Sequence, residues 1–206
     1  MPVYVCPSDP VAGGNNYRVC TGSTASSSDA GPNWEELSNG AFLPWEVFTA
    51  ADFSDGLSNT VAASEKLKSD LDPESYDPDV EAWFTSVGVF GPPPVTEEMV
   101  RLCGSLSGQP TAHHANAGRT WMVPGYHHTW YNHAVTPNAP TTDCDSNSPP
   151  GFAAFPAGGV YKANSHHRGG VNVLMMDGAV RFVADGIDLS VWRAAASRAD
   201  GETVAF

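Results

Sequence analysis

The sequence predicts an α+β fold: a globular head built on an antiparallel β-sheet, with a C-terminal β-hairpin, short helices and long loops. Short apolar runs with a period of two recur along the chain, and only two segments have helical patterning. The 206 residues also include 20 glycines and 17 prolines, which place much of the chain in turns and loops. The length fits one domain, which we expect to span residues 1–206.

The strongest local pattern is the hairpin near the C-terminus. Val171, Val173 and Met175 alternate with residues of the opposite face, and the same period resumes over 180–184. Between them, Asp177-Gly178 suits the two central positions of a type I′ turn, because both positions need positive φ. The sequence therefore predicts two strands joined by a two-residue turn.

Helix signals occur twice. We predict a helix over 97–103, with Thr96 as its N-cap and Gly104 at its end. A second helix begins after the N-cap Asp188. Its apolar face, spaced at i, i+3 and i+7, comprises Leu189, Trp192, Ala196 and also Ala195.

Other short strands are predicted by alternation. They cover 83–90, 119–123 and 130–135, and 1–9 is expected to be a short strand or an extended entry to the fold. The segment 55–68 begins with a turn and continues as a strand or a short helix, which periodicity does not separate.

The chain is strongly acidic. With 23 Asp and Glu against 10 Lys and Arg, its formal net charge is −13. Nucleic acids are excluded as partners, because their affinity comes from basic side chains that neutralise phosphates. The same charge disfavours an anionic membrane surface and supports solubility.

Four cysteines, with no C-x-x-C pair, predict two disulfides and therefore an extracytoplasmic location. They are Cys6, Cys20, Cys103 and Cys144, for which three connectivities exist. We favour Cys6–Cys20, which closes a short loop around the turn at 13–16, together with Cys103–Cys144. Four reduced thiols in a cytosolic protein are the alternative.

Several motifs occur in a fixed order along the chain. Cys-Pro-Ser-Asp stands at 6–9, Asp-Gly-x-Ser-Asn-Thr at 55–60 is followed by Glu65, and nine residues separate His167 from Asp177-Gly178. Tyr-Asn-His at 131–133 leads to Pro-Asn-Ala-Pro and Cys144. Over nearly the whole chain this pattern resembles the bacterial prepilin-type processing-associated H-x9-D-G family of pseudopilin-like envelope proteins.

The resemblance implies a pilin-like head and a non-enzymatic, extracytoplasmic structural subunit of a filament or a type II secretion-like assembly. Its partners would be copies of itself or other pilin-like subunits. Members normally begin with a prepilin leader and an apolar helix, whereas this chain begins Met-Pro-Val-Tyr-Val-Cys. No apolar run reaches the ~18–20 residues that a spanning helix needs. We therefore expect the head alone, with membrane attachment only through the missing N-terminal helix.

The resemblance also implies structural roles for the motif residues. His167 would hold the entry to the hairpin through a hydrogen bond, and Asp177 with Gly178 would supply its turn. The other motif residues that the resemblance marks are Asp55, Gly56, Ser58, Asn59, Thr60, Gly169 and Gly170.

Metal binding is a second hypothesis. The histidines form three adjacent pairs, at 113–114, 127–128 and 166–167, with His133 alone. A transition-metal site would need one ligand from each pair, because neighbours on a strand point to opposite faces. His167 with Asp177 could contribute, and hydrogen-bonded or exposed imidazoles are the alternative. Since related pseudopilin heads hold calcium, calcium is a candidate cofactor, with possible ligands at Asp52, Asp55, Asp177, Asp185 and Asp188.

Catalytic motifs fail on inspection. The sequence Gly-Ser-Leu-Ser-Gly at 104–108 has Leu106 where a nucleophile elbow needs Ser, and no phosphate-binding loop is present. The second function class is capture of a carbohydrate or another small solute, and the family has also carried a solute-binding label. Its candidate binding residues are Trp121, Tyr126 and Trp130, whose rings could stack on a sugar or fill the core.

Overall fold

A computed structural model describes residues 2–25, 38–43, 46–85, 95–108, 110, 112–145 and 158–202. Its strands are β1 (Tyr17–Cys20), β2 (Val61–Glu65), β3 (Trp130–Tyr131), β4 (Cys144–Asp145), β5 (Gly159–Val160), β6 (Gly170–Met175) and β7 (Val180–Ala184). The helices are α1 (Val95–Ser105) and α2 (Leu189–Ala194), with short 3₁₀ helices η1 (Pro2–Tyr4) and η3 (Ala50–Asp52). No helix among these residues is long and apolar enough to cross a membrane.

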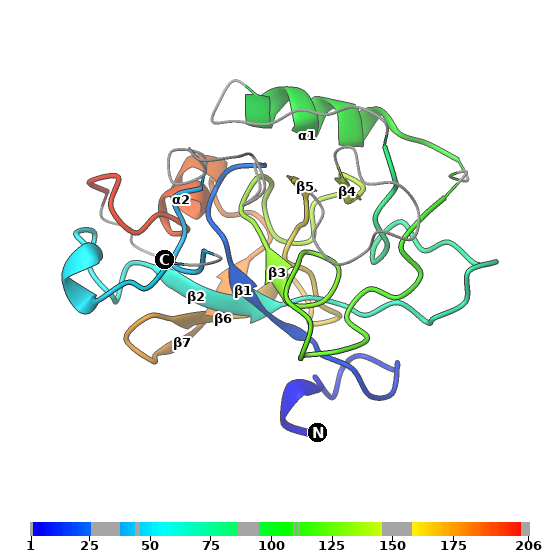
Figure 1. Ribbon diagram of the computed structural model, residues 1–206, viewed down its shortest axis with the longest axis horizontal. Coiled ribbons are helices and arrows are strands. Elements are labelled where there is room, and N and C mark those ends of the chain that lie inside the picture. Colours follow the sequence, from blue (N-terminus) through cyan, green and yellow to red (C-terminus); the bar gives the residue numbers. More distant parts are fainter. Residues whose placement is uncertain are drawn as a thin grey trace.

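Five strands form the main sheet in the order β3-β1-β2-β6-β7, and β4 pairs with β5 separately. The neighbours in the main sheet are antiparallel, except that β1 and β3 run parallel. Figure 1 shows α1 above the β4–β5 pair and the main sheet across the lower half of the molecule. The predicted α+β class is confirmed, with one parallel pair in an otherwise antiparallel sheet.

The C-terminal hairpin forms with the predicted strands but a different turn. Gly178 N donates to Met175 O at 3.0 Å, and Met175 N donates to Ala179 O at 2.8 Å. Gly178 has a φ of +88°, whereas the φ of Asp177 is not positive. The predicted type I′ turn is therefore wrong: the loop has three residues, a type I turn closed by a glycine in the left-handed region.

Both predicted helices are present. The first is longer than predicted by two residues at each end. The second begins as predicted, because the Asp188 side chain accepts a hydrogen bond from Ser190 N at 2.8 Å. Its Trp192 is fully buried among Val171, Val173 and Met175 of β6, so α2 covers the core face of the hairpin.

Most of the strands predicted outside the C-terminal hairpin are absent or shorter in the structure. Tyr4 lies in a 3₁₀ helix instead of a strand, and 119–123 contains no strand. After 119–123, three successive backbone amides at 128–130 donate to Gly125 O, so this segment forms a tight turn. The strand that follows, β3, has only two residues. The ambiguous 55–68 segment contains the strand β2. The predicted strand at 83–90 is reduced to bridges at Trp83, and its residues 86–90 lie outside the described part.

A second apolar cluster lies under α1 and contains the disulfide. Cys103 and Cys144 are bonded with a Cα–Cα distance of 5.5 Å, as predicted. Met99, Val135 and Val160 pack around them. The covalent link therefore fastens α1 to β4.

The predicted Cys6–Cys20 bond is wrong, since both residues are buried free thiols. Cys20 lies in the main core at the end of β1. Cys6 lies near Tyr17 and Glu65, where β1 begins. Four residues of strand span roughly 10 Å, which is too far for a disulfide.

Candidate functional site

The main candidate site is a cluster of three reactive side chains, Cys6, Glu65 and His167. They come from the Cys-Pro-Ser-Asp motif, the Glu that follows Asp-Gly-x-Ser-Asn-Thr, and the H-x9-D-G motif, respectively. Glu65 is the last residue of β2, and His167 lies just before β6. Because β2 and β6 are antiparallel, with Ser64 opposite Val173, the end of one strand lies beside the start of the other. Cys6 is brought there by the segment that follows η1.

The three side chains converge on one point. His167 Nε2 lies 3.0 Å from Glu65 Oε1 and 3.5 Å from Cys6 Sγ. The thiol donates to Glu65 Oε1 at 3.6 Å. Cys6 and Glu65 are buried, whereas the His167 side chain is 35% exposed, so solvent reaches the cluster from one side.

The Glu65 carboxylate is held by β6. Asn172 N donates to its Oε2 at 2.8 Å, and Asn172 Nδ2 donates to its Oε1 at 3.2 Å. Tyr17 pairs with Glu65 across β1 and β2. Burial raises the pKa of Tyr17, and its interactions with Cys6 and Glu65 raise it further. The site is therefore rigid on its carboxylate side.

The remainder of the Cys-Pro-Ser-Asp motif anchors the thiol. Cys6 N donates to Asn16 Oδ1 at 2.9 Å, and Asn16 Nδ2 donates to Asp9 Oδ2 at 2.6 Å. Asp9 also pairs with Lys68 at 3.1 Å. Burial alone would raise the pKa of Asp9, but hydrogen bonds from Asn16 and Val11 and the contact with Lys68 outweigh it and lower the pKa. These contacts fix the segment that carries Cys6.

The arrangement is not that of a nucleophile relay. In a Cys-His-acid relay the imidazole faces the nucleophile with one nitrogen and the carboxylate with the other. Here His167 Nε2 faces both partners. Three donor atoms of different type around one point fit coordination of an ion better than proton transfer along a chain.

The Asp-Gly-x-Ser-Asn-Thr motif lies at the opposite end of β2 and ties down the chain after α2. Buried Asp55 accepts from Asp200 N at 3.0 Å, Gly201 N at 2.8 Å and Ser197 Oγ at 3.2 Å. Thr60 Oγ1 donates to Ser197 O. The remaining motif residues shape the turn: Asn59 Nδ2 donates to Asp55 O, Gly56 has positive φ, and Ser58 is exposed.

The hairpin turn packs on this same loop. Met176 N donates to Thr60 O at 2.9 Å, and Asp177 N donates to Leu57 O at 3.2 Å. Asp177 and Gly178 therefore supply the turn, as expected, while His167 is at the other end of β6 and forms no joint site with Asp177. The expected hydrogen bond of His167 is made to Glu65.

The glycine pair of the motif has a steric reason. Gly169 adopts a φ of +81°. A Cβ on Gly170 would lie 2.1 Å from Val183 O and 2.8 Å from the Phe182 ring. Only glycine therefore allows β7 to approach the start of β6.

A second cluster of residues that could bind a metal, His114, His127 and Asp145, is buried away from solvent. His114 Nε2 lies 2.7 Å from Asp145 Oδ2, and the His114 and His127 ring centroids are 3.1 Å apart. One residue from each of two histidine pairs thus meets, as the sequence suggested, but His167 is not with them. Burial lowers the pKa of His114 to about 3 and raises that of Asp145. All three residues are buried.

The five candidate calcium ligands are dispersed and serve local contacts. Asp52, Asp177 and Asp188 accept from nearby amides, and Asp185 accepts from Asn138 Nδ2 at 2.6 Å. Asp55 is occupied by the amides that follow α2. Within the described residues, neither group of converging metal ligands includes any of the five.

The three predicted aromatic binding residues do not share a surface. Tyr126 and Trp130 belong to the main core, whereas Trp121 is 41% exposed and stacks on Tyr4 with centroids 5.4 Å apart. Sequence reasoning missed another aromatic pair, Tyr76 and Trp83. They line a hollow of about 200 Å³ together with Pro78, Leu106, Ser107, Gly108 and Thr142.

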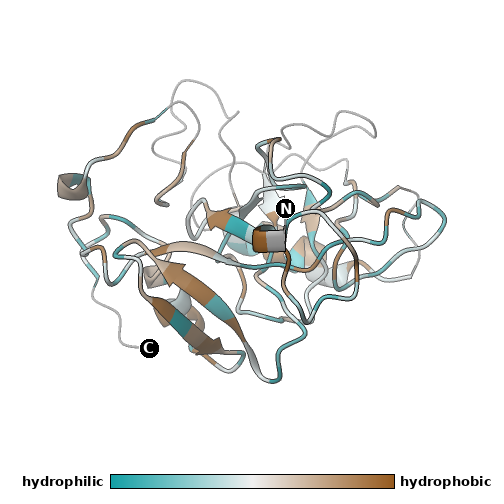
Figure 2. Ribbon diagram, turned by 90° about the horizontal axis from the view of Figure 1, so that it is seen from below, coloured by the Kyte–Doolittle hydropathy of each residue, from teal (hydrophilic) through white to brown (hydrophobic). Residues whose placement is uncertain are grey.

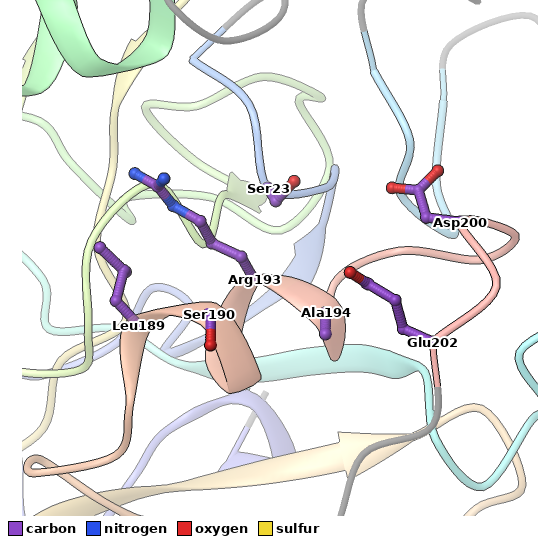
Figure 3. Close-up of a pocket in the computed structure, with 7 residues that line it drawn as sticks. All are labelled: Ser23, Leu189, Ser190, Arg193, Ala194, Asp200 and Glu202. Carbon is purple, nitrogen blue, oxygen red and sulfur yellow. The ribbon is translucent and has the colours of Figure 1, made fainter.

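A larger hollow of about 360 Å³ lies between α2 and the segment that follows it (Figure 3). Its described lining includes Arg193, Asp200 and Glu202 and no aromatic ring. Arg193 also donates to Glu97 and to Ala134 O. The described lining of this hollow has charged side chains but lacks the rings that stack on sugars.

Fold and site together define an α+β protein in which a thiol, a carboxylate and an imidazole meet beside a C-terminal hairpin. Residues 1–190 match the family model SBP_bac_10, described as a protein of unknown function (DUF1559), and the chain belongs to this family. No curated protein and no solved structure matches.

Proposed function

We propose that the protein is a non-enzymatic, extracytoplasmic, pseudopilin-like structural subunit that assembles with copies of itself through the β6–β7 hairpin. The observation that carries this proposal is an apolar outer face on an end strand of the sheet. The resemblance to pseudopilin-like proteins and the Cys103–Cys144 disulfide support the extracytoplasmic setting.

The outer face follows from the register of the hairpin. Leu174 lies opposite Val180, and Asn172 lies opposite Phe182. Leu174, Val180 and Phe182 are 41%, 68% and 53% exposed, whereas Val173 and Val183 on the other face are buried. Figure 2 views the hairpin with its apolar residues in brown and α2 behind it.

The edge of β7 provides backbone groups as well. Within the described sheet, β7 is an end strand that pairs only with β6. Natural end strands are commonly blunted by charge or proline, and β7, which reads Val-Arg-Phe-Val-Ala, has a single charge at Arg181 and no proline. A second copy can pair with this edge antiparallel, since each strand then offers the other the same donors and acceptors.

The test is the self-association of the full chain by sedimentation equilibrium. Val180→Lys places a charge on the face and should weaken association by at least about tenfold, or roughly 1.4 kcal/mol. Val47→Lys is the matched control, because Val47 is 89% exposed and is not part of the hairpin. A chain that stays monomeric, or an association that both variants leave unchanged, contradicts the proposal.

A second candidate function is capture of a small carbohydrate in the hollow beside Tyr76 and Trp83. The family name suggests a solute-binding link. The two rings meet edge to face with centroids 6.1 Å apart, and Trp83 Nε1 donates to Tyr76 Oη at 2.5 Å. Such rings at a concave surface are typical of sugar sites.

Titration with a panel of neutral oligosaccharides tests this candidate through tryptophan fluorescence. Saturable binding should be lost in Trp83→Leu and kept in Trp121→Leu, which removes the exposed ring near Tyr4. Binding that survives Trp83→Leu would place the sugar elsewhere, and no saturable signal with any sugar would remove this candidate.

A further inference from the structure

We propose that Cys6, Glu65 and His167 bind one divalent transition-metal ion, with zinc the best fit, and that the ion fastens the N-terminal segment to the sheet. The site would be tetrahedral, with three protein donors and a fourth position facing solvent at His167.

The distances between the donor atoms match this geometry. Zinc bonds of about 2.3 Å to sulfur and 2.0–2.2 Å to nitrogen and oxygen place tetrahedral ligands about 3.3–3.6 Å apart. The observed separations are 3.5 Å from Cys6 Sγ to His167 Nε2, 3.6 Å from Cys6 Sγ to Glu65 Oε1, and 3.0 Å from His167 Nε2 to Glu65 Oε1. All three atoms can therefore reach one ion with small side-chain adjustments.

The donor types select the ion. Thiolate and imidazole nitrogen are ligands of zinc and related transition metals, whereas calcium takes 6–8 oxygen ligands. Glu65 is the only oxygen donor among the three residues. The proposal thus directs metal binding away from the calcium ligands suggested by the family resemblance.

Residues around the donors hold them in place. Asn172 donates through its backbone and its side chain to the two oxygens of Glu65, which orients that carboxylate. The Cys6 backbone is fixed by Asn16, and the His167 backbone donates to Ser165 Oγ at 3.1 Å. Each ligand is therefore positioned from a different stretch of the chain.

Access distinguishes this cluster from the His114–His127–Asp145 group. The latter is buried throughout. At Cys6–Glu65–His167 the imidazole is 35% exposed, so an ion has a route of entry. The open side also leaves a position for water or a ligand from a neighbouring molecule.

The main experiment is titration of the metal-free full chain with Co²⁺ and then Zn²⁺, under argon and without reductant so that Cys103–Cys144 stays intact. One Co²⁺ per chain should give the thiolate-to-cobalt charge-transfer band and the intense visible bands of a tetrahedral site, and Zn²⁺ should remove both. X-ray absorption of the zinc form should show one sulfur neighbour at about 2.3 Å.

The chain provides a matched control. Cys6→Ser should abolish the charge-transfer band and weaken zinc binding by at least about 100-fold. Cys20→Ser removes the other buried free thiol and should leave both unchanged. His167→Ala, at a partly exposed position, should weaken binding while the circular dichroism spectrum stays native.

The proposal is overturned if the native chain binds neither ion, if the cobalt spectrum lacks a sulfur band, or if Cys6→Ser binds zinc as tightly as Cys20→Ser. None of these readouts depends on assembly, so a failure here leaves the proposed subunit role to its own test.

Discussion

A buried carboxylate lies at each end of β2, and the two carboxylates have different kinds of partner. They are Asp55, before the strand, and Glu65, at its last residue. Asp55 accepts two backbone amides and a hydroxyl from the segment after α2. Glu65 faces amide donors on one side and a thiol and an imidazole on the other. The Asp55 end is closed and structural, whereas the Glu65 end retains groups that can change partner.

The histidines repeat this contrast. His133 is fully buried, stacks on Trp192 with ring centroids 3.4 Å apart and lies 2.6 Å from Trp192 O through Nδ1. Its Nε2 is 2.9 Å from Tyr131 Oη, so the neutral ring has a partner at both nitrogens. His167 is partly exposed and uses one nitrogen for two partners. His133, which is buried and has a partner at both nitrogens, therefore has a structural role. His167, which is partly exposed and shares one nitrogen between two partners, belongs to the candidate site.

The largest expected effect is at the closed end. Asp55→Ala should lower the free energy of unfolding by about 3 kcal/mol, because it leaves the buried amides of Asp200 and Gly201 without their acceptor. Urea denaturation measures this loss. Glu46→Ala, at an exposed carboxylate, should change stability by less than about 0.5 kcal/mol. Equal effects of the two substitutions would show that the Asp55 contacts do not hold the C-terminal segment.

The next test separates the two carboxylates by metal dependence. Glu65→Gln should weaken zinc binding by about 100-fold, equivalent to roughly 2.7 kcal/mol, whereas Asp55→Asn should keep the native affinity. Isothermal titration calorimetry measures both. If Asp55→Asn loses zinc binding as fully as Glu65→Gln, the division between a closed and an open end of β2 is wrong.

The third prediction concerns acid. Burial lowers the pKa of His133 to about 3, against an ordinary value of 6.5. Its contribution to stability is therefore complete above pH 6.5 and is lost as pH falls toward 3. The stability difference between the native chain and His133→Asn should shrink over that interval in urea titrations. A difference that stays constant from pH 7 to pH 4 would show that His133 does not titrate as a buried neutral ring.

The smallest effect is at the hairpin turn beside the closed end. Gly178→Ala should cost about 1 kcal/mol, because Gly178 has a φ of +88°. Gly186→Ala should be nearly neutral, since no atom lies within 4 Å of the added Cβ and its φ is not in the left-handed region. Thermal melts compare the two variants. Zinc affinity should be unchanged in both, and a loss in Gly178→Ala would show that the two ends of the hairpin are coupled.

Sequence patterns predicted the elements that depend on neighbours in the chain. The alternation over 171–184 predicted β6 and β7, and Asp188 marked the start of α2. The Asp-Gly pair indicated a turn but not its type, because type I′ and the observed three-residue turn both place glycine in the left-handed region. Of the two predicted disulfides, Cys103–Cys144 is confirmed and Cys6–Cys20 is wrong.

The sequence by itself determined the α+β class, the hairpin, the two helices and the residue types available for chemistry, since these follow from local periodicity, capping and composition. Only the tertiary structure decided which of those residues meet. Cys6 is separated from Glu65 by 59 positions and from His167 by 161. Their contact arises because antiparallel β2 and β6 bring their ends together while Asn16 and Asp9 hold the N-terminal segment against them. No spacing within a single motif encodes that arrangement, because its energy comes from strand pairing and burial over the whole fold.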